Sequence, residues 1–252
     1  MQNNLLIDIG NSHIKAAIGL KDASLKNIKR FEYDKEHPSE KLNHIIYSFT
    51  KKNKDIYEIM KVGISLSDLK IRPAIIDLIE IYFRSSPVFI NKKINLPIKI
   101  KYSSTLGSDR ICSAVAAFRK YRKRKKILII DFGTATTCNL LINGVYEGGM
   151  ITPGIETSLH SLIQKTSLPK VKIDSKVKLI TNDTISNIKS GIWFQNLFTV
   201  ERIIQEIKKK HKNLFVIATG GLSHLIYDKT KLINKLEKNL VLEGINFILN
   251  QQ

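Results

Sequence analysis

Two short loops of the same pattern constrain this chain more than any other feature. Asp8-Ile9-Gly10-Asn11-Ser12 and Asp131-Phe132-Gly133-Thr134-Ala135 each contain an acid, a spacer, a glycine and a nearby hydroxyl. Each loop follows an apolar run, Leu5–Ile7 or Ile127–Ile130, of the kind that forms a buried strand. Because a glycine at a strand end lets a ligand approach the backbone closely, the pair predicts two phosphate-binding loops that together hold a nucleotide.

The order of apolar and polar runs predicts an α/β chain whose second half echoes the first. In the first half we expect strands at residues 4–9, 13–20, 26–33, 60–64 and 88–90 and helices at 38–52 and 72–83. The helix at 38–52 would bury one apolar face, formed by Leu42, Ile45, Ile46 and Phe49. The first three strands predict an antiparallel meander.

The second half repeats the strand, loop, strand, turn, strand order. We expect strands at residues 126–131, 135–142, 145–150 and 214–218 and helices at 109–121, 154–165, 184–210 and 240–249. Asn143-Gly144 is the hairpin signal within this half. We therefore predict two α/β domains, residues 1–112 and 113–252, with a nucleotide cleft between them and a C-terminal helix that packs back across the boundary.

The composition excludes several classes of protein. The chain has 252 residues, of which 43% are hydrophobic, so a packed core is expected. No apolar run approaches the ~18 residues of a membrane span, and an acid follows too soon after Met1 for a signal peptide, so we expect a cytoplasmic protein. Cys112 and Cys138 lack metal-ligand spacing and are interpreted as buried thiols.

The charge is the strongest oddity of the composition. Forty-one basic residues against 22 acidic ones give +19, which invites a nucleic-acid interpretation. The excess is mainly lysine and is spread over the whole chain, whereas sequence-specific readers favour arginine. We interpret the densest run, residues 119–126, as a solvated helix end whose cations face the exposed carbonyls, and we expect no nucleic-acid partner and no membrane partner.

The residues of the first loop suit a magnesium-bound polyphosphate. Asp8 can hold the cation or its waters, Gly10 allows close approach, Asn11 and Ser12 can donate hydrogen bonds, and Lys15 can reach a phosphate. The alternative is an ordinary turn that contains an acid and a glycine.

The second loop crowds the hydroxyls of Thr134, Thr136 and Thr137 beside Asp131, an acid that needs a partner after so apolar a strand. The alternative is that Asp131 only caps the turn. Further on, Thr219-Gly220-Gly221 follows a predicted strand and could let an adenine or ribose lie flat on the backbone, although a plain strand-to-helix turn fits equally well. The chain contains neither a dinucleotide-binding glycine motif nor a P-loop.

Six segments, taken in order, resemble the motifs of the type III pantothenate kinases. They are Asp8–Lys15, Gly107-Ser108-Asp109-Arg110, Asp131–Thr137, Gly148–Gly154, Leu168-Pro169 and Thr219-Gly220-Gly221. That family belongs to the superfamily of acetate kinase, sugar kinases, Hsp70 and actin. The resemblance spans nearly the whole chain and implies two ribonuclease H-like domains of the actin-like ATPase kind.

The resemblance also implies an activity and its participants. It implies that ATP, as its magnesium complex, phosphorylates pantothenate in the first committed step toward coenzyme A, in a homodimer that needs a monovalent cation such as potassium or ammonium. Asp109 matches the general base and Asp131 the ligand of that cation. The matched substrate-binding residues are Tyr102, Gly107, Ser108, Asp109, Arg110 and Thr184. The matched ATP-binding residues are Asp8, Ile9, Gly10, Asn11, Ser12, His13, Ile14, Lys15 and Thr134, with adenine expected near Gly220 and Gly221.

The chemistry of Gly107–Arg110 agrees with this assignment. In a loose phosphoryl transfer the acceptor hydroxyl mainly needs orienting, and a carboxylate such as Asp109 does this and takes the proton late. Arg110 could hold the carboxylate of the substrate by a two-pronged contact. The alternative is that Ser108 and Asp109 are simply the first residues of a helix. Thr184 has the same ambiguity, since Asn182, Asp183 or Thr184 could cap the helix that follows.

Two segments depart from the family pattern. Tyr102 lies only five residues before Gly107, with Ser103-Ser104-Thr105 where relatives have a proline-containing stretch, so its substrate contact stays open. Ser65-Leu66-Ser67-Asp68 stands where relatives tend to carry small residues followed by valines. Two other functions also stay open: another small-molecule kinase of the superfamily, or a non-catalytic regulator with a basic nucleic-acid-binding surface.

Overall fold

The chain forms two compact units in the computed structural model, which describes residues 3–32, 40, 42–47, 59–83, 85–102, 105–174 and 177–251. Unit 1 comprises Met1–Tyr121 and Leu240–Gln252, and unit 2 comprises Arg122–Asn239. The division therefore falls after Tyr121 rather than after residue 112. The reason is packing: helix α3 (Ser108–Lys120) makes its most extensive helix contact with α7 (Leu240–Leu249), and both helices also contact strand β4 (Ile59–Leu66).

Unit 1 is built on a five-stranded mixed sheet in the order β3-β2-β1-β4-β5. The strands β1 (Asn3–Ile9), β2 (His13–Gly19) and β3 (Leu25–Glu32) form the predicted antiparallel meander. Beside them, β4 pairs with β1 and β5 (Val88–Phe89) pairs with β4, both in parallel. Parallel pairing needs crossover connections, and the second of these is helix α2 (Arg72–Phe83), preceded by the short 3₁₀ helix η2 (Leu69–Ile71).

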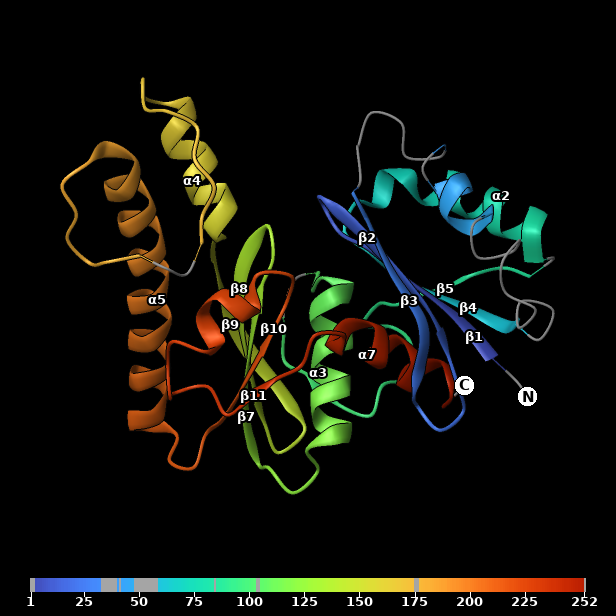
Figure 1. Cartoon of the computed structure of the whole chain (residues 1–252). Helices are drawn as coiled ribbons and strands as arrows, with labels where there is room; N and C mark the ends of the chain where they lie inside the picture. Colours follow the sequence, from blue (N-terminus) through green and yellow to red (C-terminus); the bar gives the residue numbers. More distant parts are fainter. Residues whose placement is uncertain are drawn as a thin grey trace. The chain divides into compact units, whose positions relative to one another are not determined.

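Both faces of this sheet are covered, with α2 on one side and α7 on the other (Figure 1). On the α2 side, alternate residues of β1 such as Leu5 and Ile7 pack against Ile75 and Ile79. The helical residues 42–47 add Leu42, Ile45 and Ile46 to the same cluster, as predicted. Phe49, which was expected beside them, lies outside the described residues.

The other face carries glycines that let α7 approach. A Cβ at Gly63 would meet the side chains of Ile245 and Leu249, and one at Gly19 would meet Asn246. Because α7 lies this close, the predicted return of the C-terminal helix to the N-terminal half of the chain is confirmed.

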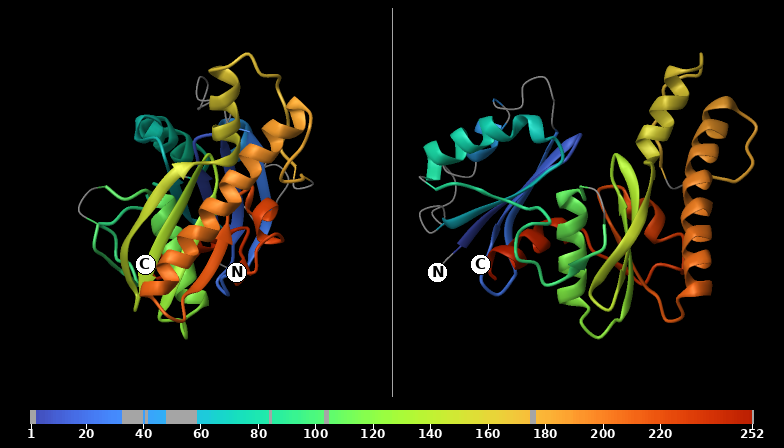
Figure 2. Two further views of the ribbon diagram at one scale, coloured as in Figure 1. Left: turned by 90° about the vertical axis from the view of Figure 1, so that its left-hand side faces the viewer. Right: turned by 180° about the vertical axis from the view of Figure 1, so that it is seen from behind.

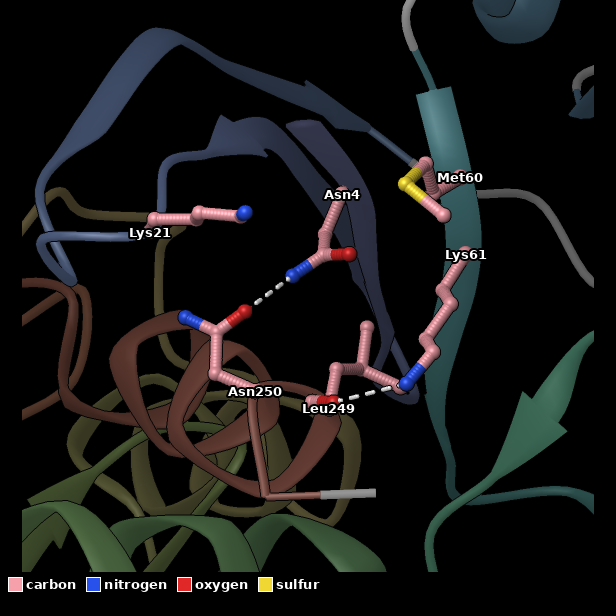
Figure 3. A pocket seen from close by; sticks show the side chains of 6 residues that line it. All are labelled: Asn4, Lys21, Met60, Lys61, Leu249 and Asn250. Carbon is pink, nitrogen blue, oxygen red and sulfur yellow. Dashed lines mark hydrogen bonds between the residues drawn. The ribbon is translucent and has the colours of Figure 1, made fainter. Parts of the chain in front are cut away.

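Amide side chains hold α7 in place at this face. Asn4 Nδ2 donates to Asn246 Oδ1 at 2.9 Å and to Asn250 Oδ1 at 2.8 Å, and Asn246 Nδ2 donates to the carbonyl of Leu20 at 2.9 Å. Lys61 Nζ donates to the carbonyl of Leu249 at 3.2 Å, where the last carbonyls of the helix need donors. Asn4, Lys61, Leu249 and Asn250 line a pocket of about 320 Å³ together with Lys21 and Met60 (Figure 3).

Helix α3 meets α7 backbone to backbone at Gly244, where an added Cβ would collide with the carbonyl of Cys112. We expect Gly244→Ala to lower the free energy of unfolding by ~1–3 kcal/mol, because overpacking outweighs the ~1 kcal/mol that alanine gains in a helix. Gly191→Ala is the matched control, since nothing lies within 4 Å of a Cβ there, and it should stabilise the chain. Urea unfolding measures both, and a Gly244→Ala protein as stable as the wild type would contradict the close packing.

Unit 2 contains a second mixed sheet, in which five strands run in the order β11-β10-β7-β8-β9. The strands β7 (Lys126–Phe132), β8 (Ala135–Ile142) and β9 (Val145–Pro153) form the predicted antiparallel set. Asn143 and Gly144 both have positive φ, 48° and 74°, as their hairpin turn requires. The strand β10 (Phe215–Thr219) pairs with β7 in parallel, and β11 (Lys235–Leu236) pairs with β10.

Helices α4 (Ile155–Gln164) and α5 (Thr184–Lys210) lie side by side in both views of Figure 2 and were predicted to within two residues. The apolar residues of these helices, such as Trp193 of α5, form one buried cluster with alternate residues of β7, such as Leu128 and Ile130. Among the described residues, four short elements were not predicted, namely η2, β6 (Lys99–Ile100), α6 (Ser223–Tyr227) and β11.

Three expectations from composition can be compared with the structure. Cys112 and Cys138 are free buried thiols, as predicted. Arg119 and Lys120 lie in the last turn of α3, which confirms the expected basic helix end, and Lys120 pairs with Glu243 of α7 at 2.7 Å. Within the part of the chain that the structure describes, no helix is both long and apolar enough to cross a bilayer.

Candidate active site

The first loop connects β1 to β2 in unit 1. The backbone N–H of Gly10 donates to the carbonyl of His13 at 3.0 Å, which closes a tight turn directly after Asp8 and Ile9. In the sheet, Asp8 pairs with Lys15 on β2 and with Ser65 on β4. Lys15, which was expected to reach a phosphate, therefore lies beside Asp8. Ser65 is a second neighbour of Asp8, and it was assigned no role from the sequence.

Asp8 occupies an electrostatically unfavourable position for a carboxylate. Its pKa rises from the ordinary 3.8 to about 6, chiefly because burial disfavours the charge and also because the carboxylate of Asp109 is near. The charge of Lys15 and a hydrogen bond from Ser65 lower this pKa, but by less. The two acids singled out from the sequence, 101 positions apart, thus act on each other within unit 1.

Asp109 lies in the first turn of α3, where the helix dipole favours an acid. Burial raises its pKa above the ordinary 3.8, while the backbone N–H and the charge of Arg110 pull it down. Its carboxylate is folded over Gly107, since a Cβ at Gly107 would lie 2.5 Å from Asp109 Oδ1. The absence of a side chain at position 107 is therefore what leaves room for the acid.

Arg110 and Tyr102, both expected at the substrate, are brought together. The guanidinium carbon of Arg110 lies 5.5 Å from the centre of the Tyr102 ring, within range of a cation–π contact, and Arg110 is buried. A pocket of about 330 Å³ opens beside Tyr102, lined also by Lys92 and by residues of the loop 94–100. That loop carried no signal in the sequence analysis, because its apolar residues lack a period.

The hydroxyl of Ser108 is used inside the fold rather than at its surface. Ser108 Oγ accepts from the N–H of Leu66 at 2.8 Å and lies 3.1 Å from Ser65 Oγ. Both serines are buried, Ser65 completely. Any contact of Ser108 with a substrate would therefore come from its backbone.

The second loop connects β7 to β8 in unit 2. Gly133 N donates to the carbonyl of Ala135 at 3.2 Å, and the side chain of Thr134 is exposed. The backbone carbonyl of Thr134 accepts hydrogen bonds from Gly154 N at 3.1 Å and from Thr157 Oγ1 at 2.5 Å, so the start of α4 holds the loop in place.

Asp131 lies in a row of hydroxyls across three strands, because it pairs with Thr137 on β8 and with Thr219 on β10. Its carboxylate lies against Gly220, whose φ is +94° and where a Cβ would collide with it. The predicted adenosine motif thus adjoins the predicted cation ligand within unit 2. The sequence left this neighbourhood undetermined.

Thr184 is the first residue of α5, and the N-cap of this helix is Asp183 rather than Thr184. The side chain of Asp183 accepts from the N–H of Ser186 at 2.9 Å, and this bond lowers the pKa of Asp183. Thr184 is exposed, so its hydroxyl is not needed as the cap.

Among the described residues, no group of three or more His, Cys, Asp or Glu side chains is placed to hold a metal ion. The oxygens near Asp8 nevertheless suit a magnesium ion that brings its own phosphate ligands. Two neighbouring carboxylates with raised pKa values are groups that a cation would stabilise.

The family model for type III pantothenate kinase matches residues 4–206, most of the chain. The chain belongs to this family. Membership implies an ATP-dependent enzyme that phosphorylates pantothenate for the biosynthesis of coenzyme A, and so the resemblance found in the sequence is confirmed.

Solved structures show the same fold at low identity. A conserved putative Baf family transcriptional activator from Campylobacter jejuni has a TM-score of 0.62 at 17% identity, with 98% of both chains covered. A ROK family glucokinase from Streptomyces griseus, solved with glucose and AMPPNP, has a TM-score of 0.61 at 12% identity and covers 99% of this chain and all of its own.

An inorganic polyphosphate/ATP-glucomannokinase from an Arthrobacter strain has a TM-score of 0.57 at 15% identity, with both chains fully covered. At these identities the likeness extends to the fold alone. It confirms the predicted α/β class, with two mixed sheets of the actin-like ATPase type.

Proposed function

We propose that this chain transfers the γ-phosphate of ATP to the hydroxyl of pantothenate, with Asp109 as the general base. The observation that carries the assignment of the base is the placement of Asp109 at the start of α3, next to Arg110 and within the electrostatic reach of Asp8. A raised pKa brings a carboxylate closer to the value at which it can accept a proton during the reaction.

The roles of the surrounding residues follow from their chemistry. Arg110, backed by the Tyr102 ring, would hold the substrate carboxylate, and a planar guanidinium suits a carboxylate better than an ammonium does. Asp8 would hold magnesium or its waters, which supplies charge neutralisation to the transferring phosphate. The amides and hydroxyls of residues 9–14, Lys15 and Thr134 would contact the phosphates, and Gly220 and Gly221 the adenosine. ATP is a cytoplasmic substrate, so we also propose a cytoplasmic location.

The decisive experiment is the mass gain of pantothenate, by one phosphate group, when the purified protein is incubated with magnesium and ATP. We expect one phosphopantothenate for each ADP formed. A panel of other small alcohols serves as the control for substrate class. ATP-dependent phosphorylation of a panel member but not of pantothenate would reassign the substrate, and salt-sensitive DNA retention without any turnover would favour a regulatory protein.

We propose that Asp131 is a ligand of a monovalent cation, together with oxygens of its threonine neighbours. The support is its position between Thr137 and Thr219 on adjacent strands. Replacing potassium or ammonium by sodium should lower kcat, because the smaller ion fits a different oxygen cage. Steady-state rates in the three chloride salts at equal ionic strength measure this, and equal rates in all three would contradict a selective cation site.

We also propose that the protein is a homodimer that uses the apolar surface of β9 and α5. Met150, Ile151 and Phe198 are 48%, 62% and 49% exposed, and a groove of about 600 Å³ lies between Met150, Phe198 and Ile203. Light scattering should give twice the chain mass for the wild type and a monomer for Phe198→Glu. The control is Ile180→Glu, because Ile180 is 84% exposed outside the groove. A monomeric wild type would contradict the proposal.

A further inference from the structure

A chain of hydrogen bonds runs from strand β4 through two buried serines to the carboxylate of Asp8. The N–H of Leu66 donates to Ser108 Oγ at 2.8 Å, and Ser108 Oγ lies 3.1 Å from Ser65 Oγ. Asp8 and Ser65 are partners across the β1–β4 pair, so their side chains lie on the same face of the sheet, and a hydrogen bond from Ser65 lowers the pKa of Asp8. Ser108 is the first residue of α3 and directly precedes Asp109.

The two ends of this chain determine its direction. A backbone N–H can only donate, and an ionised carboxylate can only accept. With Asp8 ionised, the Ser65 hydroxyl must donate to it, so the oxygen of Ser65 is left to accept from Ser108. The carbonyl of Leu66, 3.2 Å from Ser108 Oγ, is the competing acceptor. A chain that ends on a charge is favoured, because hydrogen bonds to ionised groups are stronger and successive bonds polarise one another.

The hydroxyl of Ser65 is not needed to hold the two strands together. The strand ends are already joined by the backbone bond from Ser67 N to the carbonyl of Ile9 at 3.0 Å. Ser65 is fully buried next to Ile64 and Leu66, where an apolar side chain would avoid the cost of burying a hydroxyl. The hydroxyl adds the connection to Ser108, and so to the first turn of α3.

We propose that Ser65 is a positioning residue that ties Asp8 to the start of α3, so that the acid on the phosphate side and the base on the acceptor side keep a constant separation. This inference rests on the proposed roles of Asp8 and Asp109. Phosphoryl transfer depends on holding the attacking and leaving oxygens in line, and misplacement by about 1 Å can cost ~10²-fold in rate. A link between the two acids therefore acts on kcat more than on binding.

A double-mutant cycle in the full-length protein tests the link. Ser65→Ala should lower kcat by ~10–100-fold, while KM for ATP and for pantothenate changes little, because only the transition state needs the alignment. Ser108→Ala interrupts the same chain, so the double variant should be no slower than the slower single variant. Ser67→Ala is the matched control, since this serine is exposed on the same segment, and its kinetics should equal those of the wild type.

Two further variants separate positioning from stability. Ser65→Thr keeps the hydroxyl and should restore most of kcat, whereas Ser65→Cys keeps the size with a weak donor and should restore little. Urea unfolding of each variant shows whether it is folded under the assay conditions. An unchanged kcat in Ser65→Ala, additive effects in the cycle, or a rise in KM that accounts for the whole loss would overturn the inference.

The proposed function can fail separately from the link. If the wild type phosphorylates another alcohol but not pantothenate, the substrate assignment is wrong, and the same cycle measured with that alcohol still decides the role of Ser65. If the wild type phosphorylates pantothenate and the cycle is additive, the function holds and the link is wrong. A wild type that phosphorylates no acceptor in the panel overturns both.

Discussion

Replacing Asp109 by asparagine should lower kcat with pantothenate by ~10²–10⁴-fold, the range expected when a positioned general base is lost. Asparagine has nearly the same shape and can still fold over Gly107, but it cannot accept the proton of the attacking hydroxyl. Binding of ATP should persist, because Asp109 is assigned to the acceptor and not to the nucleotide. Steady-state kinetics and calorimetric titration with a non-hydrolysable ATP analogue measure the two properties.

The matched control is Asp77→Asn, the same chemical change at an exposed position of α2 in the same unit. It should leave kcat unchanged. If Asp109→Asn turns over pantothenate at a rate near that of the wild type, Asp109 is not the base. If it loses ATP binding as well, its role is to hold the first loop through Asp8.

Asp8→Asn should stabilise the nucleotide-free protein at pH 8 while removing most of its activity. The pKa of Asp8 rises from 3.8 to about 6 on folding, so the folded chain binds a proton more tightly than the unfolded chain does. Stability from this group is complete below the unfolded pKa and is lost as the pH rises through about 6. At ~1.4 kcal/mol for each tenfold change in proton affinity, ionised Asp8 costs at most ~3 kcal/mol.

The pH dependence makes this prediction specific. In urea unfolding without nucleotide or divalent cation, the gain from Asp8→Asn should be larger at pH 8 than at pH 5, because part of the penalty disappears once the wild-type carboxyl is protonated. Asp77→Asn again serves as control and should show no such difference. Equal stability of Asp8→Asn and the wild type at pH 8 would show that the carboxylate is not strained in the folded chain.

The unfavourable charge of Asp8 in the folded chain is consistent with a site that binds a cation during function. Burial and the neighbouring carboxylate of Asp109 disfavour the charge of Asp8, and Lys15 offsets only part of this. Magnesium arriving with ATP would reverse the balance. Such a trade of stability against function is common where a site must bind a charged ligand.

Local patterns predicted most of the secondary structure. The apolar runs before Asp8 and Asp131 formed β1 and β7, and Asn143-Gly144 formed the hairpin turn. Long periodic segments such as α5 were also predicted well, because burial of one face repeats every few residues. The two-residue strands β6 and β11 escaped prediction, since their strand conformation comes from pairing with neighbours rather than from their own residues.

The sequence by itself determined the two acid–glycine loops, the helix that carries Asp109 and the family to which the chain belongs, because each of these depends on residues close together in the chain. The tertiary structure decided which groups act on one another. Asp8 meets Ser65 only through the parallel pairing of β1 with β4, and it meets Asp109 only because α3 docks on β4 and α7. Those contacts join residues 57 and 101 positions apart, and no local pattern encodes them. The paired loops thus marked where phosphate chemistry belongs, and packing determined the pKa of Asp8 and the hydrogen-bond chain that ends on it.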